Sequence, residues 1–502
     1  MNLRSFTLHD QIERNACLHG DGAAFVADGR SVSHAQYAAR SAQLAAGLAG
    51  LGVAVGDRVA ILAPNCLSYL DLFGAAARLG AIVVPVNWRL SAEEVAYVLQ
   101  DSAAKVLIAA PEMHDLVPEA ARRGMLAYST GPAATGHWKA LAQLYLEAQE
   151  PPARIDDDAG LVIIHTAAVG GRPRGALLSH RNLMVAAMTS SQAWSLTSAD
   201  VQLGILPLFH VAGIGITLAL LQAGGCTVVL PRFDAKALVG LIDEQGGSVM
   251  GSFPPMLGSL LDAAAQAGSA LSSLRVVTGI DTPETLDRFS AACPHADFWV
   301  AYGQTETAGP ISLARHSERP GSAGRPVAQH VLAFVDEQDR PVGAGFVGEI
   351  VVRGPMVFSG YWRLDEDNAF TFRDGWHHTG DMGRRDGDGY LWYAGRSPAK
   401  ELIKPGGENV YPAEVERALL EHPAVAEAIV FGVPDAQWGE AIKAVCVLKP
   451  AQSLAAEALI EFVGGRIARY KKPKHVVFVG SLPKTPAGAI DRTAVKAAHG
   501  QA

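Results

Sequence analysis

Apolar positions in the first hundred residues alternate between two patterns. Residues 37–51 have the spacing of an amphipathic helix and stop at Gly52, whereas residues 58–62 form a short continuous apolar run typical of a buried strand. The two patterns return at residues 69–79 and 81–86. Continuous apolar strands that alternate with helices predict mostly parallel sheets covered by helices.

A helix is predicted after Ser91, because Ser91 and Glu94 form the Ser-x-x-Glu capping box that starts many helices. Similar strand and helix units recur from about residue 160 to residue 300. Between Asp200 and Arg232 no charged residue occurs, which could be taken for a membrane span. A proline, a histidine, a glutamine and a glycine pair interrupt this stretch, so we expect a buried strand, loop, helix and strand and no transmembrane segment.

The pattern changes after about residue 321. Residues 347–354 and 389–395 indicate antiparallel strands or a small barrel. From residue 396 onward, helices and strands alternate again in a smaller α+β unit. We therefore predict a boundary near residue 396.

Composition narrows the class of protein. A chain of 502 residues is long enough for about three domains or subdomains. With 49% hydrophobic and 18% charged residues it is too apolar to be disordered, and its 52 glycines and 28 prolines indicate many tight turns. The formal net charge of −8 makes a nucleic-acid partner unexpected.

Cysteine usage indicates the compartment. The five cysteines are scattered, and their odd number and the lack of a CxxC pair argue against a disulfide framework and against a zinc site. The first ten residues carry charges and lack the apolar core of a signal peptide. A reducing, cytoplasmic location is therefore expected.

Two motif matches are predicted to be structural. Residues 343–348 match GxGxxG, but polar residues precede them and a strand is predicted to follow, whereas a dinucleotide site needs a strand before and a helix after. His377 and His378 are adjacent, so in a strand they point to opposite faces and suit a shared metal poorly.

Four other segments carry groups that could act on a nucleotide. In the first, residues 163–180, a strand enters a loop with two glycines, Arg172 and Arg174. Exposed backbone N–H groups beside guanidinium groups suit a polyphosphate, although a mobile surface loop explains the same residues equally well.

The second segment, residues 300–307, combines an aromatic ring, a glycine, a hydroxyl and a carboxylate, which can stack on a base, donate to a phosphate and hold Mg²⁺. In the third segment Asp381 could accept ribose hydroxyls or simply cap a turn. The fourth runs from Gly395 to Glu416. Each segment alone is more often structural.

Taken together and in this order, the segments resemble the ANL superfamily of adenylate-forming enzymes, and within it the acyl- and aryl-CoA ligases. The resemblance rests on Tyr-Gly-x-Thr-Glu at 302–306, Thr-Gly-Asp at 379–381 and Gly-Gly-Glu-Asn-Val-Tyr-Pro at 406–412, and it covers about residues 56–492. It implies an α/β fold. A large N-terminal AMP-binding domain, 1–395, would hold two helix-covered, mostly parallel sheets and a small β-barrel-like subdomain. A small mobile α+β domain, 396–502, would follow a hinge at about 396–401.

The resemblance implies that a carboxylic acid, fatty or aromatic, reacts with ATP and Mg²⁺ to give an acyl-AMP, and that the acyl group then passes to CoA. A homodimer is left open. The nucleotide would contact residues of these motifs and of the phosphate loop: Gly170, Gly171, Arg174, Thr278, Gly279, Ile280, Tyr302, Gly303, Gln304, Thr305, Asp381 and Arg396.

Individual roles follow from the same resemblance. Tyr302 would stack on adenine, Thr305 would hold the α-phosphate, and Asp381 with Arg396 would hold the ribose. Glu306 would bind the metal. The remaining implied catalytic residues, CoA-binding residues and hinge residue are Thr166 and His210, Gly406 and Gly407, and Glu401. His210 would lie near the reacting carboxylate, unless it is an ordinary core histidine.

Three stretches depart from the family pattern. The phosphate loop, 166–175, lacks the usual hydroxyls after Thr166, and Arg174 replaces a lysine. Residues 278–280 replace the usual Gly-Gly-Ala. The hinge motif is two residues longer than usual, and Pro398 would stiffen it.

The most serious departure is at Ala489, where the family motif has the lysine that bridges the substrate carboxylate and the α-phosphate. Loss of one preorganised charged contact costs roughly 3–4 kcal/mol, or about 10²–10³ in rate. We expect poor adenylation with an intact second half-reaction. The intact flanking residues favour a deliberate substitution over natural decay, and the origin stays open.

Three alternatives remain. The altered phosphate loop and Ala489 would also suit a non-catalytic nucleotide- or acyl-binding relative. A ligase that loads a carrier protein would share the tunnel motif at 406–410. A luciferase-like oxygenase would share every motif.

Overall fold

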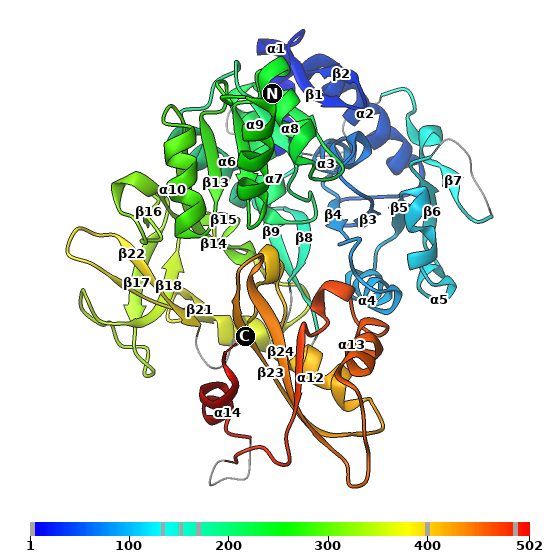
Figure 1. Ribbon diagram of the computed structural model, residues 1–502. Coiled ribbons are helices and arrows are strands. Elements are labelled where there is room, and N and C mark those ends of the chain that lie inside the picture. The colour runs from blue at the N-terminus through cyan, green and yellow to red at the C-terminus, as the bar shows by residue number, and fades with distance from the viewer. Residues whose placement is uncertain are drawn as a thin grey trace.

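The computed structural model describes residues 6–131, 136–148, 150, 154–166, 172–396, 402–484 and 490–501. Two large sheets and a smaller antiparallel sheet are formed by residues up to 396, and the C-terminal elements lie below them in Figure 1. Alternation of short buried strands with helices over residues 58–129 therefore builds the parallel sheets that the sequence predicts.

The first large sheet has eight described strands and is parallel except at one edge. Its order is β19 (Gly360–Tyr361), β9 (Arg174–Ser179), β8 (Gly160–Thr166), β4 (Ile82–Pro85), β3 (Arg58–Leu62), β5 (Val106–Ala109), β6 (Leu126–Ser129) and β7 (Lys139–Ala140). The helices connected to these strands are α2 (His34–Gly50), α3 (Leu67–Leu79), α4 (Ala92–Ser102) and α5 (Glu119–Arg122). Ser91 caps α4 and the Ser91–Glu94 capping box is present, as predicted.

The second large sheet has nine described strands, with antiparallel pairs at both edges. Its order is β16 (Arg325–Pro326), β15 (Gly309–Arg315), β14 (Asp297–Gln304), β13 (Val276–Gly279), β12 (Val249–Ser252), β10 (Val201–Gly204), β11 (Cys226–Val229), β1 (Ala23–Ala27) and β2 (Arg30–Ser33). The helices of this half are α1 (Leu8–Leu18), α6 (His180–Ala193), α7 (Val211–Ala223), α8 (Ala235–Gln245), α9 (Met256–Ala267) and α10 (Pro283–Ala292).

The uncharged stretch after Asp200 folds as β10, a loop, α7 and β11, as predicted. Helix α7 is apolar on all sides because it packs against α6 and its side chains enter two hydrophobic clusters. Among the described residues, no helix combines the length and apolar character needed to span a membrane. All five cysteines are free thiols.

A third, antiparallel sheet carries the Thr-Gly-Asp motif. It contains β17 (Val331–Val335), β18 (Gly348–Arg353), β20 (Phe372–Arg373), β21 (Trp376–Arg385) and β22 (Leu391–Arg396), and α11 (Asp365–Thr371) precedes β20. The GxGxxG match at 343–348 is a turn that leads into β18 and is not followed by a helix, which confirms its structural interpretation.

The C-terminal elements form a three-stranded sheet with its own apolar core. Its strands and helices are α12 (Pro412–Leu420), β23 (Val425–Asp435), β24 (Gly439–Leu448), α13 (Ala456–Gly464), β25 (His475–Phe478) and α14 (Arg492–His499). Residues 397–401, including the predicted hinge residue Glu401, lie outside the described residues. The boundary between domains 1–395 and 396–502 therefore stays a prediction.

Candidate active site

Two adjoining cavities lie where β13 and β14 end and the loop at 404–409 approaches them. The larger has a volume of about 230 Å³ and the smaller about 50 Å³. Ligands of open α/β sheets bind at this carboxyl edge. The predicted site residues that line the larger cavity are His210, Thr278, Gly279, Ile280, Gly303, Gln304, Thr305, Gly406 and Gly407.

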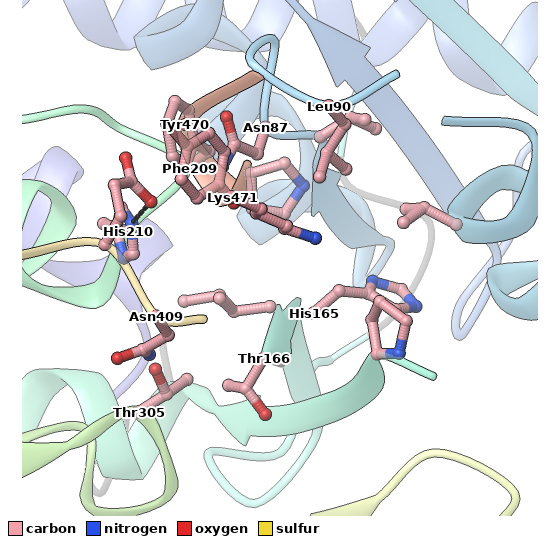
Figure 2. A pocket seen from close by; sticks show the side chains of 16 residues that line it. Asn87, Leu90, His165, Thr166, Phe209, His210, Thr305, Asn409, Tyr470 and Lys471 are labelled. Carbon is pink, nitrogen blue, oxygen red and sulfur yellow. Dashed lines mark hydrogen bonds and ion pairs between the residues drawn. The ribbon is translucent and has the colours of Figure 1, made fainter. Parts of the chain in front are cut away.

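The smaller cavity connects the phosphate-loop strand to the C-terminal elements. It is lined by Thr166 at the end of β8 and by Tyr470 and Lys471 from the C-terminal part (Figure 2). His210, Thr305, Glu408 and Asn409 line both cavities, so the two spaces meet at these residues. The Thr305 hydroxyl has no hydrogen-bond partner among the described residues.

A cluster of polar groups surrounds Asp381, which is 1% exposed. The Tyr302 hydroxyl donates to Asp381 Oδ2 at 2.8 Å, and Gln304 Nε2 donates to the same oxygen at 2.6 Å. Arg396 Nε lies 3.3 Å from Asp381 Oδ1. The Tyr302 ring is 5.9 Å from that of Tyr393. Residues from β14, β21 and β22 that are up to 94 positions apart thus meet beside the larger cavity, which Gln304 lines and which Tyr302, Asp381 and Arg396 do not line.

The position of Asp381 results from a local break in the sheet. The register between β18 and β21 shifts at Glu349, so residues 379–381 form a bulge. There the N–H of Gly380, whose φ is +69°, donates to Glu349 Oε1 at 2.8 Å instead of joining the strand ladder. The Thr379 hydroxyl donates to the Ile350 carbonyl at 2.6 Å and accepts from the Asp381 N–H at 3.1 Å. Glu349 therefore helps to hold the segment that presents Asp381.

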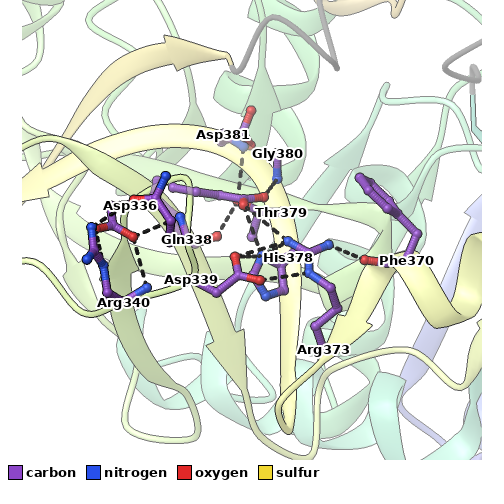
Figure 3. Close-up of polar contacts among 12 residues, drawn as sticks. Asp336, Gln338, Asp339, Arg340, Phe370, Arg373, His378, Thr379, Gly380 and Asp381 are labelled. Carbon is purple, nitrogen blue, oxygen red and sulfur yellow. Dashed lines mark hydrogen bonds and ion pairs between the residues drawn. The ribbon is translucent and has the colours of Figure 1, made fainter.

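Glu349 belongs to a partly buried ion-pair network with Asp339, Arg373 and His378, and Figure 3 shows the last three. Glu349, His378 and Asp339 are close enough together to suggest a metal site, but the Arg373 guanidinium already supplies the positive charge between them. Arg373 Nε lies 3.0 Å from Asp339 Oδ2, and its Nη2 is 2.9 Å from His378 Nδ1. His377 faces the other side of β21, 3.4 Å from Gln304, so the two histidines point apart as predicted.

A second chain of contacts leads from the phosphate-loop strand to Glu306. The Thr166 hydroxyl donates to Glu306 Oε1 at 3.4 Å, and the Tyr361 hydroxyl donates to the same oxygen at 2.8 Å. Burial and the Glu306 carboxylate raise the pKa of Tyr361 well above its ordinary value, so the phenol keeps its proton. The oxygens of Glu306 and Thr166 are of the type that Mg²⁺ prefers, so this corner fits the predicted metal.

Arg174 lies behind this corner and not in the cavity. Its guanidinium pairs with Asp367, donates to the Tyr361 hydroxyl at 3.1 Å and lies 3.9 Å from the Tyr361 ring centre. The side chain is 10% exposed. Gly170 and Gly171 of the same loop lie outside the described residues. The Arg174 guanidinium therefore donates to the Tyr361 hydroxyl, which in turn donates to Glu306.

The loop at 404–409 brings the C-terminal part to His210. Glu408 lies 3.2 Å from His210 Nε2 and 2.8 Å from Arg89 Nη1. Burial by itself would raise the pKa of Glu408, but His210 and Arg89 hold it below its ordinary value. Gly406 and Gly407 have φ of +58° and +87°, and a Cβ on Gly407 would lie 3.0 Å from the Phe253 ring. Only glycine suits this close approach.

A second buried contact joins the same two parts of the chain. Lys471 lies 2.5 Å from Glu94 and 2.7 Å from Glu414, and its side chain is 3% exposed. Glu94 Oε2 also accepts from the Ala468 N–H at 3.1 Å. Glu94, the partner of Ser91 in the α4 capping box, therefore also contacts the C-terminal elements.

The sequence assigned no role at the site to several of these residues, although the family resemblance extends to Tyr361 and to residues 470–473. Those that the structure adds to the cavity or its contacts are Arg89, Tyr361, Lys404, Glu408, Asn409 and Lys471. Glu408 and Asn409 lie inside the Gly-Gly-Glu-Asn motif, and their place in this motif was the sequence feature that could have indicated a role at the site. Arg89 has no local signal, because its role depends on a partner 319 residues away.

Comparison with known proteins agrees with this arrangement. The family model described as AMP-binding enzyme matches residues 12–362, and the model of the AMP-binding enzyme C-terminal domain matches residues 414–489. The chain belongs to the AMP-binding enzyme family. Within the ANL adenylate-forming enzymes, it falls among the acyl- and aryl-CoA ligases.

Relatives in this family cover almost the whole chain. An indoleacetate–CoA ligase of Aromatoleum aromaticum is 36% identical over 97% of each chain. A feruloyl-CoA synthase of Amycolatopsis is 35% identical and covers 94% of this chain and 95% of its own. The chain is an AMP-forming acyl-CoA synthetase that uses ATP and CoA as substrates.

Solved structures of the AMP-binding family share the fold. A chain from Rhodopseudomonas palustris, provisionally described as a long-chain-fatty-acid CoA ligase, is 48% identical and has a TM-score of 0.75, covering 79% of this chain and 100% of its own. A double mutant of Bacillus subtilis o-succinylbenzoate CoA synthetase with a product analogue is 28% identical, covers 97% of each chain and has a TM-score of 0.86. The same synthetase with AMP is 27% identical over 97% of this chain and 98% of its own, and its TM-score is only 0.71.

Proposed function

We propose that the protein is a cytoplasmic ligase that joins a fatty or aromatic carboxylic acid to CoA in two steps. In the first step a carboxylate oxygen attacks the α-phosphorus of ATP, and pyrophosphate leaves with the electrons of the broken P–O bond. In the second step the CoA thiol, having lost its proton, attacks the acyl carbon and AMP leaves. The observation that carries the proposal is the continuous space in which Thr305, His210 and the loop at 404–409 meet.

The nucleotide would occupy the part of this space next to Asp381. Tyr302 would stack on adenine, while Asp381 and Arg396 would hold the ribose hydroxyls. The hydroxyl of Thr305 faces the cavity and would donate to the α-phosphate. Glu306, with Thr166 beside it, would hold Mg²⁺, which would neutralise charge on the phosphates.

The orientation of the C-terminal part suits the second step. The predicted tunnel glycines Gly406 and Gly407 already line the larger cavity, where CoA would deliver its thiol. The TM-score is higher against the product-analogue complex than against the AMP complex of the same synthetase, which supports this assignment. We therefore propose that the C-terminal part turns about a hinge near Glu401 between the two steps.

We further propose that Ala489 makes the first step slow. Ala489 itself lies outside the described residues. The described residues nearest to it, Lys484 and Ile490, do not line either cavity, and Lys484 lies 2.6 Å from Glu427 instead. This supports the idea that position 489 reaches the nucleotide only in the other orientation.

The test separates the two steps. We expect acid-dependent exchange of pyrophosphate into ATP to rise about 10²–10³-fold in Ala489→Lys, because a preorganised charge returns to the reacting centre. Conversion of supplied acyl-AMP and CoA to thioester should change little. Equal exchange by both proteins would overturn the slow first step, and failure of both proteins to make thioester from acyl-AMP would overturn the ligase function.

A further inference from the structure

The larger cavity extends from His210 into a space between α6 and α7. Ala186, Ser190 and Trp194 line it and are four residues apart, so they share one face of α6 and its C-terminal cap. Gly215 and Ile216 line it from α7. If the protein is the ligase proposed above, this space receives the acyl part of the acid, and its lining then indicates which acid fits.

Two donors in this lining have no hydrogen-bond partner among the described residues. The Ser190 hydroxyl makes no hydrogen bond with any described residue, and Ser190 is 5% exposed. The indole N–H of Trp194, also 5% exposed, is unpaired among the described residues as well. Only the Trp194 N–H is fully buried, whereas the Ser190 hydroxyl stays accessible from the cavity and is free to donate to a ligand there. A bound acid that carries an acceptor would pair with Ser190.

Gly215 leaves room that the fold itself does not need. A Cβ built on Gly215 meets no atom within 4 Å, whereas one on Gly213 of the same helix would lie 2.2 Å from the Pro207 carbonyl oxygen. Gly213 is therefore needed for packing. Gly215 faces the cavity, and a glycine there makes α7 less stable than an alanine would. No close neighbour requires a glycine at this position. The absence of a side chain at Gly215 leaves space in the cavity for a bound ligand.

The walls favour a flat and compact group. Trp194, Leu206 and Ile216 are each 5% exposed and line the cavity on this side. Phe253 and Met256 add an aromatic ring and a thioether. A hydrocarbon chain would place only methylene and methyl groups against Ser190 and would leave its hydroxyl unpaired.

We infer that the acid is a compact aromatic acid whose ring carries an oxygen substituent that hydrogen-bonds to Ser190, with Gly215 providing the space for the ring. This inference rests on the proposed function and names the substrate class of the same site. Ser190 and Gly215 are specificity-determining residues in this assignment. Neither takes part in the chemical steps.

Binding of unreactive intermediates tests the inference independently of the slow first step. The probes are three acyl-sulfamoyl adenosines, made from 4-hydroxycinnamic acid, cinnamic acid and decanoic acid, with titration calorimetry as the readout. We expect the 4-hydroxycinnamoyl probe to bind at least about 10-fold more tightly than the other two, because a pocket with an unpaired donor discriminates against ligands that lack the acceptor. Tightest binding of the decanoyl probe would overturn the inference.

Two variants with matched controls identify the residues. Ser190→Ala should weaken the 4-hydroxycinnamoyl probe about 10-fold and leave the cinnamoyl probe unchanged, whereas Ser191→Ala, whose hydroxyl does not line the cavity, should change neither. Gly215→Leu should weaken both aromatic probes about 10-fold or more. Gly240→Leu, at a helix position that is equally open but outside the cavity, should not.

AMP binding and the melting temperature keep the outcomes distinct. A variant is folded if its melting temperature and its affinity for AMP equal those of the parent protein. Its probe affinities then report on the acyl site. Equal weakening of the hydroxylated and unhydroxylated probes by Ser190→Ala would overturn the role of Ser190. If neither the probes nor AMP bind to the parent protein, the proposed function is wrong. If AMP binds tightly but the three probes bind equally well, only the inferred substrate class is wrong.

Discussion

The Glu408 carboxylate lies 3.2 Å from the His210 imidazole, although the two residues are 198 positions apart in the chain. His210 precedes α7 at the acyl cavity, and Glu408 belongs to the loop that carries the predicted CoA-binding glycines. The pair therefore ties the C-terminal part to the acyl site in the orientation that suits thioester formation.

Glu408→Gln should weaken this connection, because it removes the negative charge that faces His210 and Arg89. We expect thioester formation from supplied acyl-AMP to fall about 10-fold, since a charge-assisted hydrogen bond contributes roughly 1.5–3 kcal/mol. Pyrophosphate exchange should fall less. Glu421→Gln, which alters an exposed ion pair with Arg466, is the control for a change of surface charge. An equal loss in both half-reactions would show that Glu408 does not act through this orientation.

Lys471→Met should destabilise the protein, because it leaves the carboxylates of Glu94 and Glu414 buried without their cation. Removing one member of a buried ion pair costs about 3–5 kcal/mol. Chemical denaturation followed by circular dichroism measures the loss. Lys472→Met, whose partner Glu461 is exposed, should cost less than about 1 kcal/mol. Similar losses for the two variants would contradict the buried role of Lys471.

Glu349→Ala should weaken ATP binding, although Glu349 itself would not contact the nucleotide. It removes the acceptor of the Gly380 N–H, so the bulge at 379–381 loses a contact that positions Asp381. We expect the KM for ATP to rise about 10-fold with a smaller change in kcat, as for a group that helps to bind the nucleotide. Asp336→Asn, in an exposed pair with Arg340 near the same sheet, should leave the KM unchanged. A drop in kcat at constant KM would argue against a positioning role.

Stability should fall as the pH decreases from about 6.5 to about 4. Burial lowers the pKa of His180 and of His330 from 6.5 to about 4, so in this window the unfolded chain binds protons that the folded chain does not. Each such histidine contributes up to about 1.4 kcal/mol per pH unit. His180 Nδ1 accepts from the Leu8 N–H at 3.2 Å, which requires that nitrogen to be unprotonated.

His180→Asn isolates one histidine, because the asparagine Oδ1 takes the position of Nδ1 and can still accept from Leu8. Unfolding free energies at pH 6 and pH 5 should differ by about 1.2 kcal/mol less in His180→Asn than in the parent protein. An identical pH dependence in the two proteins would show that His180 titrates normally in the folded state.

Local patterns predicted most elements because helices and strands are specified largely by neighbouring residues. The strand at 58–62 matches β3, and the Ser91–Glu94 capping box begins α4. The ends of other elements differ by a few residues; the helix predicted at 37–51, for example, is α2, which begins at His34 and ends at Gly50. Helix ends depend on how the last turn packs, which spacing alone does not reveal.

The sequence by itself determined the family and the groups that contact a nucleotide, since Tyr302, Glu306 and Asp381 stand in short motifs that can be recognised one segment at a time. Only the tertiary structure decided which distant residues meet. The contact of Glu408 with His210, and the space that Ser190 and Gly215 share, depend on how separate elements pack. Such contacts cannot be recognised from the local sequence, because each partner alone is an ordinary polar or small residue in its own helix or loop.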